Sequence, residues 1–356
     1  MDCGTFTYEA AECLVRWYRK NKRDLPWRKT HDAYAVWISE IMLQQTRVEA
    51  VIDKYTAFMQ ELPDIAALAS VEDDRLMKLW EGLGYYSRAR NLKKCAAVIM
   101  ARHHGRIPHN YEELLALPGI GSYTAGAISA IAFGIPAPAV DGNVMRVLSR
   151  LLGSADDVKE PETKKNFENI LREFYRDHPC SPAFVRNLTQ GFMDLGASVC
   201  LPNGRAKCTQ CPWQERCAAC KNNLTDVLPV RGKAPERRLE ERTLLIIRDG
   251  DSFLLRKRPE RGLLAGLYEF PGIPGFCTKE EAADAVSAMG YEPLQIHVLP
   301  ESRHLFTHLE WHMHAYEIRV SGIHEENDLL ITKRELLNRA IPSAFRTYLE
   351  YYSLRQ

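Results

Sequence analysis

The stretch from Glu112 to Phe133, EELLALPGIGSYTAGAISAIAF, decides the fold of its region. A first helical segment ends at Leu117, Pro118–Gly121 makes a tight turn, and a helix of small residues follows. In such a turn Gly119 and Gly121 leave backbone N–H groups open to close approach, and the start of the second helix favours an anion. The stretch therefore predicts two helices joined by a hairpin that either binds phosphate or is a plain helical connection.

A polar trio stands further along, where Asp141-Gly142-Asn143 interrupts an apolar region. A carboxylate in such a place needs a partner, because an unpaired buried charge is costly. One interpretation is that Asp141 caps the N-terminus of a helix running to Leu152. A catalytic role is compatible with capping, since one carboxylate can do both.

Before the hairpin lies a helical segment, Val36–Thr46, that is apolar on nearly every side of Glu40. Burial raises the pKa of a glutamate, so Glu40 can stay protonated near neutral pH, as a general acid requires. The alternative is that Glu40 forms a salt bridge with a nearby arginine such as Arg28 or Arg47. Sequence alone leaves open whether Glu40 and Asp141 meet in space.

Five of the ten cysteines crowd into residues 200–220. Clustered thiols in a chain without a secretory signal indicate a metal or iron–sulfur site. Two ligand sets are possible: the first four cysteines for a four-iron cluster, or the last four for zinc. The gap between the two C-x-x-C pairs is short for a zinc ribbon, which favours iron–sulfur. The five cysteines are Cys200, Cys208, Cys211, Cys217 and Cys220.

The chain is long enough for two or three domains, at 356 residues. Residues 1–228 are predicted as a helical region, in which 29–134 form one subdomain and 1–28 with 135–228 form the other. Residues 229–241, charged and proline-containing, are predicted as a linker. Residues 242–356 are predicted as an α+β domain, with a hairpin around Asp249-Gly250-Asp251 and a strand through Leu309, Trp311 and Met313.

Composition narrows the class of protein. Hydrophobic residues make up 46% and charged residues 26% of the chain, as in ordinary globular proteins. No apolar run approaches the ~18 residues of a membrane span, and the N-terminus has no apolar signal region. We therefore expect a cytoplasmic protein, associated with the nucleoid if bacterial. The net charge is +1, so any nucleic-acid surface must be a local basic patch.

Together, SEIMLQQT, LPGIGSYTAGAI, VDGNVMRVLSR and the cysteine loop resemble the MutY-type adenine DNA glycosylases of the helix–hairpin–helix superfamily. The resemblance runs from Leu25 to Cys217 and continues more weakly beyond. It implies a mostly α glycosylase body with an iron–sulfur loop, followed by an α+β Nudix-like domain around Gly266–Gly272. That domain lacks the Arg-Glu pair of Nudix hydrolases ahead of Glu280-Glu281, so we expect recognition and not hydrolysis.

The resemblance also implies roles for single residues. Glu40 protonates the flipped adenine at N7, Asp141 stabilises the charge on the sugar, Asn143 orients the site and Tyr123 stands beside the sugar. Related endonuclease III-like enzymes have a Schiff-base lysine in place of Tyr123, which implies a glycosylase without lyase activity. The cofactor implied is a [4Fe–4S] cluster on Cys200, Cys208, Cys211 and Cys217. The expected partner is double-stranded DNA with adenine opposite 8-oxoguanine or guanine, bound by a monomer.

Contacts to DNA and to the lesion are implied for two parts of the chain. In the C-terminal domain, Thr307 replaces the usual serine of a Phe-Ser-His loop. The spacing from Cys200 to Cys208 is one residue longer than the usual six, which keeps Cys220 open as the fourth ligand. Two other functions stay open: an endonuclease III-type lyase for oxidised pyrimidines, and a non-catalytic DNA-binding module. The predicted DNA- and lesion-binding residues are Arg28, Gln45, Thr46, Leu83, Tyr85, Gly119, Gly121, Phe306, Thr307 and His308.

Overall fold

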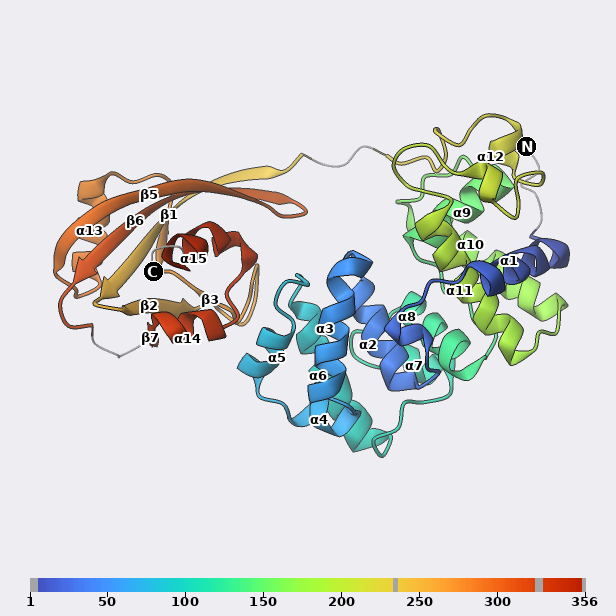
Figure 1. The fold of residues 1–356 in the computed structure, drawn as a ribbon, viewed down its shortest axis with the longest axis horizontal. Coiled ribbons are helices and arrows are strands. Elements are labelled where there is room, and N and C mark those ends of the chain that lie inside the picture. The colour runs from blue at the N-terminus through green and yellow to red at the C-terminus, as the bar shows by residue number, and fades with distance from the viewer. Residues whose placement is uncertain (1–5, 233–235, 324–328, 354–356) are drawn as a thin grey trace. The chain divides into compact units, whose positions relative to one another are not determined.

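A computed structural model describes residues 6–232, 236–323 and 329–353 (Figure 1). The chain divides into two compact units. Unit 1 comprises Met1–Val71 and Arg90–Lys233, and unit 2 comprises Glu72–Ala89 and Ala234–Gln356. Parts of three predicted segments lie outside the described residues: the start of 1–28, the middle of the linker 229–241, and two short stretches of 242–356.

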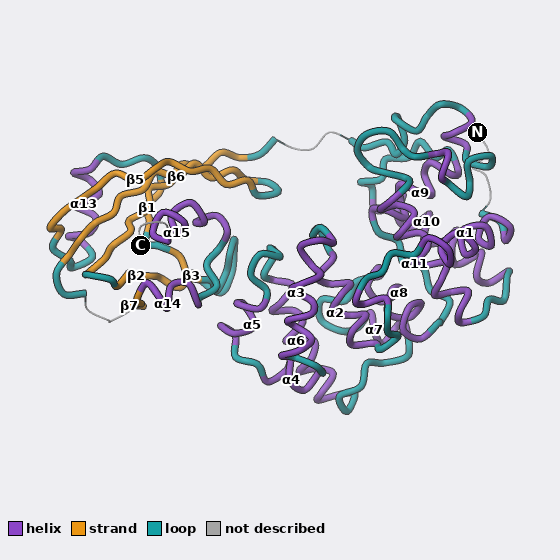
Figure 2. The backbone as a smooth tube through the Cα atoms, viewed as in Figure 1, coloured by secondary structure: helices purple, strands orange, loops and turns teal. Residues whose placement is uncertain are grey.

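Unit 1 is built from helices, as predicted for residues 1–228 (Figure 2). None of the helices in the described ranges is both long and apolar enough to cross a membrane. In chain order the helices are α1 (Tyr8–Asn21), η1 (Pro26–Arg28), α2 (Ala33–Leu43), α3 (Val48–Glu61), α4 (Ile65–Ser70), α6 (Ser87–Arg102), α7 (Tyr111–Leu115), α8 (Ser122–Ala127), η2 (Ile128–Phe133), α9 (Gly142–Leu152), α10 (Pro161–Asp177), α11 (Pro182–Ser198), η3 (Cys208–Gln210) and α12 (Ala218–Lys221).

The predicted helical hairpin is present between α7 and α8. The side chain of Asn110 caps α7 by accepting a 3.0 Å hydrogen bond from the Glu113 N–H. Gly119 has a positive φ of 76°, and a Cβ there would lie 2.8 Å from the Cβ of Asn91, so the turn requires glycine. Helix α8 begins after Gly121 and continues into the π-helix η2, which ends at Gly134 in the left-handed conformation.

Helix α2 is buried on almost every side, which explains its lack of an amphipathic pattern. Its N-terminus is capped by Asp32, whose side chain accepts a 2.8 Å hydrogen bond from the Ala35 N–H. The helix ends at Leu43, earlier than the predicted segment, because Gln45 has a positive φ of 56°. That turn takes Gln45 and the following residue out of the helix.

One apolar core joins α1, α9, α10 and α11 of unit 1. Phe6, Phe174 and Phe192 meet in this core, and Trp213 of the cysteine loop packs against two of these rings. The indole N–H of Trp213 also donates a 2.8 Å hydrogen bond to the carbonyl of Ala10. Burial of each large side chain is worth about 1.5–3 kcal/mol, so the cysteine loop is anchored firmly to the body.

Unit 2 is a sheet with helices on both faces. The strands are β1 (Arg238–Asp249), β2 (Ser252–Lys257), β3 (Tyr268–Glu269), β4 (Gly272–Pro274), β5 (Pro293–Leu305), β6 (Leu309–Val320) and β7 (Leu329–Thr332). The helices are α5 (Asp73–Leu79), α13 (Lys279–Ala288), α14 (Lys333–Asn338), η4 (Ser343–Phe345) and α15 (Arg346–Ser353). The strand order is β3-β2-β1-β6-β5, with β4 on β1 and β7 on β2.

Strand β1 is parallel to β6 and carries the run Leu244–Ile247, in which all four side chains are buried. Leu244 and Ile246 join the core on one face, while Leu245 and Ile247 join the core on the other. The predicted hairpin is confirmed, since Asp249 pairs with Ser252. Strand β1 begins at Arg238, inside the segment predicted as linker, because its first residues already pair with β6.

Candidate active site

A cavity of about 630 Å³ in unit 1 is lined by residues from η1, α2, α8, α9 and α11. All four predicted catalytic residues line it: Glu40, Tyr123, Asp141 and Asn143. Three predicted DNA-binding residues, Arg28, Gln45 and Thr46, line it as well. The fold thus brings together side chains that are far apart in the sequence.

Glu40 lies on α2 and is only 3% exposed. The hydroxyl of Tyr123 donates a 2.5 Å hydrogen bond to Oε2 of Glu40. Burial raises the pKa of Glu40 above its ordinary value; the Tyr123 hydrogen bond and the charge of Arg28 oppose this rise, and Asp141 adds to it. Among the described residues, no ion pair joins Glu40 to Arg28 or to Arg47, so the salt-bridge alternative is not formed.

Tyr123 stands in the first turn of α8, directly after the hairpin. Burial raises its pKa well above the ordinary value, and the neighbouring carboxylates Glu40 and Asp141 raise it further. The phenol therefore keeps its proton over the whole physiological range. It can act only as a hydrogen-bond donor to Glu40 and as a polar wall of the cavity.

Asp141 is the N-cap of α9, as its position before an apolar helix predicted. Its Oδ1 accepts a 2.8 Å hydrogen bond from the Val144 N–H, and its Oδ2 accepts one of 2.8 Å from the Asn143 side chain. Burial raises the pKa of Asp141, while the hydrogen bonds from Val144 and Asn143 lower it. The start of α9 adds a favourable dipole for negative charge at this carboxylate.

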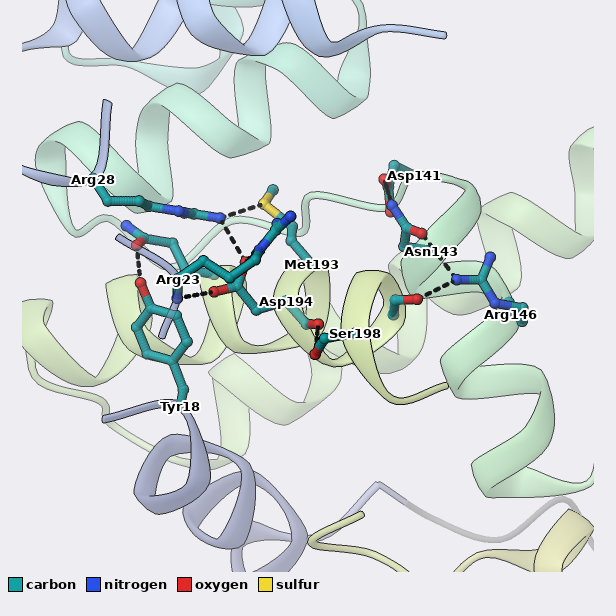
Figure 3. A network of polar contacts seen from close by, with 11 residues as sticks. Tyr18, Arg23, Arg28, Asp141, Asn143, Arg146, Met193, Asp194 and Ser198 are labelled. Carbon is teal, nitrogen blue, oxygen red and sulfur yellow. Dashed lines mark hydrogen bonds and ion pairs between the residues drawn. The ribbon is translucent and has the colours of Figure 1, made fainter. Parts of the chain in front are cut away.

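Behind Asp141, the buried Arg146 holds Asn143 in place (Figure 3). Its Nη2 donates to Oδ1 of Asn143 at 2.9 Å and to the carbonyl of Gly196 at 2.8 Å, and its Nε donates to the carbonyl of Cys200 at 2.8 Å. A Cβ on Gly196 would lie 2.7 Å from the Cβ of Asn143, so this approach requires glycine. One side chain therefore links the cavity to the first cysteine of the loop.

A second charged network lies beside the cavity, on η1 and α11 (Figure 3). Asp194 is completely buried and accepts hydrogen bonds from Arg23 at 2.7 and 3.0 Å and from Arg28 at 3.3 Å. Both arginines line the cavity. The sequence reasoning did not single out Asp194, Arg23 or Arg146. A charged residue within an apolar helix was the available signal, because such a group needs buried partners.

The four predicted cluster ligands lie in one loop. Cys200 follows α11, Cys208 begins η3, Cys211 follows η3 as its C-cap, and Cys217 is the N-cap residue of α12. Burial raises the pKa of Cys211 to about 12. The hydrogen bond from the Trp213 N–H lowers this pKa, and the nearby thiols of Cys200, Cys217 and Cys208 raise it. Cys220 is not among the thiols that act on Cys211. Within the described ranges, no group of three or more Cys, His, Asp or Glu side chains is positioned to hold a metal ion.

The loop sulfurs also receive protein hydrogen bonds. Arg150 donates to the Cys200 sulfur at 3.2 Å, and the Trp213 N–H donates to the Cys211 sulfur at 3.5 Å. The Cys217 thiol donates to the carbonyl of Arg150 at 3.2 Å. Arg150 is buried and also bonds the carbonyls of Leu201 and Leu228, so the loop is held from inside the unit.

In unit 2 the predicted lesion-reading residues differ in exposure. Tyr85 is 47% exposed and has a positive φ of 46°, whereas Leu83 is buried. The hydroxyls of Tyr85 and Thr307 are 2.7 Å apart and hydrogen-bonded. Phe306 packs edge-on against Trp311, with ring centroids 4.9 Å apart. A side-chain hydrogen bond therefore joins Tyr85 to the Phe306–His308 loop.

Comparisons with known proteins cover both units. Residues 38–176 match the model of the HhH-GPD superfamily base excision DNA repair protein, and residues 242–351 match a NUDIX domain. An adenine DNA glycosylase from Buchnera aphidicola is 33% identical, covering 89% of each chain. The human adenine DNA glycosylase is 32% identical, covering 87% of this chain and 66% of the human protein.

Solved structures agree with the fold of unit 1. A thermostable thymine-DNA glycosylase superposes with a TM-score of 0.52 and 27% identity, covering 60% of this chain and 95% of that one. An endonuclease III–DNA covalent intermediate superposes with a TM-score of 0.51 and 22% identity over 62% of this chain and all of the other. The predicted fold class is thus confirmed. Because its similarity to adenine DNA glycosylases extends over both units and most of its length, this chain belongs to the adenine DNA glycosylase family.

Proposed function

We propose that this chain hydrolyses the N-glycosidic bond of adenine that stands opposite 8-oxoguanine or guanine in double-stranded DNA. The observation that carries the proposal is the buried Glu40, which receives a hydrogen bond from Tyr123 in a cavity shared with Asp141. A buried carboxyl group of raised pKa beside a second, hydrogen-bonded carboxylate suits an acid-assisted cleavage.

The cavity suits a purine nucleotide that has left the base stack. Its volume of about 630 Å³ falls within the range of ligand pockets. An enzyme can act on a base of a duplex only after that base has flipped out, at a cost of a few kcal/mol. Arg23, Lys164 and Arg231 line the cavity and would attract the phosphates on either side of the flipped nucleotide.

In the proposed reaction Glu40 donates its proton to N7 of adenine, which turns the base into a better leaving group. The bond between C1′ and N9 then breaks, and positive charge develops on the deoxyribose. The Asp141 carboxylate stabilises that charge in the low-dielectric cavity, and Asn143 keeps the carboxylate in position. Water then adds to C1′ and gives up one proton, which restores the proton of Glu40, and the products are free adenine and an abasic site.

The cavity does contain one lysine, although Tyr123 stands at the position of the endonuclease III-type nucleophile. Nζ of Lys164 donates a 3.0 Å hydrogen bond to the Ser122 hydroxyl and lies 3.7 Å from Oε1 of Glu168. An amine that is held by a hydroxyl and a carboxylate in this way is a poor nucleophile. We therefore propose a monofunctional glycosylase that leaves the strand intact.

A [4Fe–4S] cluster on Cys200, Cys208, Cys211 and Cys217 forms part of the proposal. The chemistry of the donor set supports this, because the thiols of Cys200, Cys208 and Cys217 all act on Cys211, and N–H groups point at the sulfurs of Cys200 and Cys211, as around protein-bound clusters. The described thiols do not by themselves form a metal-holding group in this structure. The group would tie the loop to α11 and α9 and present the basic side chains of the loop to DNA. The zinc set with Cys220 is less favoured, because Cys200 acts on Cys208, Cys211 and Cys217, whereas Cys220 acts on Cys208 and Cys217 but not on Cys211.

Recognition of the oxidised guanine is proposed for Tyr85 and the loop Phe306–His308. An exposed aromatic ring can insert beside a base step and hold a distorted duplex. The Thr307 hydroxyl keeps the hydrogen-bonding group of the usual serine. The hairpin with Gly119 and Gly121 is proposed to bind the DNA backbone through its N–H groups.

The test is adenine release under single-turnover conditions from matched duplexes with adenine opposite 8-oxoguanine, guanine or thymine. We expect fast release from the first, slower release from the second and none from the third. Borohydride trapping on the same duplexes should leave no covalent adduct. Release from none of the duplexes would overturn the proposed activity, and a trapped adduct lost in Lys164→Ala would establish a lyase.

A further inference from the structure

The carboxylate of Asp194 is completely buried, yet it does not line the cavity. It therefore cannot touch a base that occupies the cavity. Its partners are two arginines that do line it, Arg23 and Arg28. A buried carboxylate that is hydrogen-bonded to two arginines of the cavity wall can influence the site through those arginines (Figure 3).

Asp194 holds both arginines in defined positions. Its Oδ1 accepts from Nε of Arg23 at 3.0 Å and Nη2 at 2.7 Å, and its Oδ2 accepts from the Arg23 backbone N–H at 3.2 Å. The same Oδ1 accepts from Nη2 of Arg28 at 3.3 Å. The Arg28 side chain is 8% exposed, and its buried Nε has no hydrogen-bond partner within the described residues.

Arg28 matters because its charge reaches Glu40. The charge of Arg28 lowers the pKa of Glu40, and it also lowers the pKa of Tyr123. Arg28 nevertheless pairs with Asp194 and makes no ion pair with Glu40. Without that partner, the charge of Arg28 would act more strongly on Glu40, whose pKa it already lowers, and would favour ionised Glu40.

We propose that Asp194 is a positioning residue that draws Arg28 away from Glu40 and offsets the charge of the Arg23–Arg28 pair, so that Glu40 keeps the proton it delivers to adenine. This inference rests on the proposed function. It gives a role to a residue that does not line the cavity and is far from Glu40 in the sequence.

The charged and titratable groups around Glu40 come from several elements. Tyr123 on α8 donates a hydrogen bond to Glu40, and Arg28 on η1 contributes a positive charge; both favour the ionised form of Glu40. Asp141 at the start of α9 disfavours that form. Around Asp194 lie Arg23, Arg28 and Tyr18 of α1, whose own pKa is raised by burial and by Asp194. Of the two groups that favour the ionised form of Glu40, Arg28 is the charged one. Asp194 is the carboxylate bonded to Arg28 and to its neighbour Arg23.

The experiment is the pH dependence of single-turnover adenine release by the whole chain. Because Glu40 acts in its protonated form, the rate falls as the pH rises through the pKa of Glu40. Asp194→Asn keeps the shape and removes the charge, so the descending limb should move to lower pH. On the alkaline side the rate should fall by roughly threefold or more relative to the acidic side. Asp177→Asn, which removes an exposed carboxylate paired with Arg176, is the control and should leave the limb in place.

A second variant tests the opposite sign. Arg23→Gln removes a positive charge while Asp194 stays, so the descending limb of its pH–rate profile should move to higher pH. In the double variant Asp194→Asn/Arg23→Gln, the limb should return towards its position in the wild type. A purely structural role predicts an equal loss of rate at every pH with no shift of the limb, and that result would overturn the inference. If Asp194→Asn does not fold, Arg23→Gln alone decides by the direction of its shift.

The two proposals fail in different ways. If the wild type releases no adenine, the proposed function fails and the pH profile cannot be recorded. If the wild type is active and both variants keep its limb, only the role of Asp194 is wrong. Thermal unfolding of each variant, followed by circular dichroism, separates loss of folding from loss of proton control.

Discussion

Glu40 and Asp141 are both carboxylic acids on the wall of one cavity, but their hydrogen bonds differ. Glu40 accepts one side-chain hydrogen bond, from Tyr123, in apolar surroundings. Asp141 accepts two, from the Val144 N–H and the Asn143 amide, at a helix N-terminus. Burial raises the pKa of both, but the groups that favour ionisation are concentrated on Asp141. This difference supports the proposed roles of Glu40 as the acid and Asp141 as the charge stabiliser.

Tyr123→Phe tests the acid at the scale of a single hydrogen bond. The Tyr123 hydroxyl lowers the pKa of Glu40, so its removal should raise that pKa. Glu40 would then stay protonated to higher pH, and the descending limb of the single-turnover rate should move to higher pH. A limb that stays in place or moves to lower pH would show that this hydrogen bond does not control the acid.

Helix α8 holds Tyr123 in place by packing against the segment that leads to Asp141. A Cβ on Gly126 would lie 1.9 Å from the carbonyl oxygen of Pro138, a backbone atom with little freedom to move. The absence of a side chain at Gly126 is therefore what allows α8 to approach the residues before Asp141. The two halves of the site depend on this one close contact.

Gly126→Ala should therefore be costly. We expect it to lower the free energy of unfolding by about 1–3 kcal/mol or more, because α8 and the 136–140 segment must move apart. Gly121→Ala, where an added Cβ meets nothing within 4 Å, is the matched control. It should leave stability nearly unchanged and weaken DNA binding. Denaturant unfolding measures the free energy of unfolding of the two variants. Equal stability of Gly126→Ala and Gly121→Ala would contradict the packing argument.

The cysteine loop gives a second prediction at the scale of an element. Cys200→Ser should abolish the visible absorption of a purified iron–sulfur protein and lower its melting temperature, because Cys200 is a proposed ligand. Cys220→Ser should retain both, since Cys200 acts on all three other proposed ligands, whereas Cys220 does not act on Cys211. Absorption spectra and iron analysis decide, and the reverse pattern would move the fourth ligand to Cys220.

Local features of the site were predictable from sequence, and features that depend on distant residues were not. The cap by Asp141, the turn at Gly119 and the helix around Glu40 follow from neighbouring residues. The end of α2 was placed too late, because the positive φ of Gln45 leaves no clear mark in the sequence. The partners of a buried group such as Asp194 or Arg146 lie on other helices, so the sequence shows only that partners are needed.

At the scale of the whole molecule, the proposed catalytic residues and the proposed lesion-reading residues belong to different units. The cavity with Glu40 and Asp141 belongs to unit 1, whereas Tyr85 and Thr307 belong to unit 2. Each unit has a hydrophobic core of its own. The strand through Leu309, Trp311 and Met313 was readable because these buried residues alternate with half-buried polar neighbours. The start of β1 was missed, because its charged residues resemble a linker.

Thr307→Ala tests this division. Loss of one hydroxyl contact should lower the preference for adenine opposite 8-oxoguanine over adenine opposite guanine by about threefold to tenfold. The descending limb of the pH profile should stay in place, since Glu40 is in the other unit. Thr307→Ser keeps the hydroxyl and should behave like the wild type. A shifted limb in Thr307→Ala would contradict the separation of roles.

The most direct test of the central claim compares the wild type with Glu40→Gln on a duplex with adenine opposite 8-oxoguanine. Single-turnover adenine release and duplex binding are measured on the same preparations. Glutamine keeps the shape of the side chain but has no proton to give, so release should be lost while binding is retained. Undiminished release by Glu40→Gln would contradict the assignment of Glu40 as the acid.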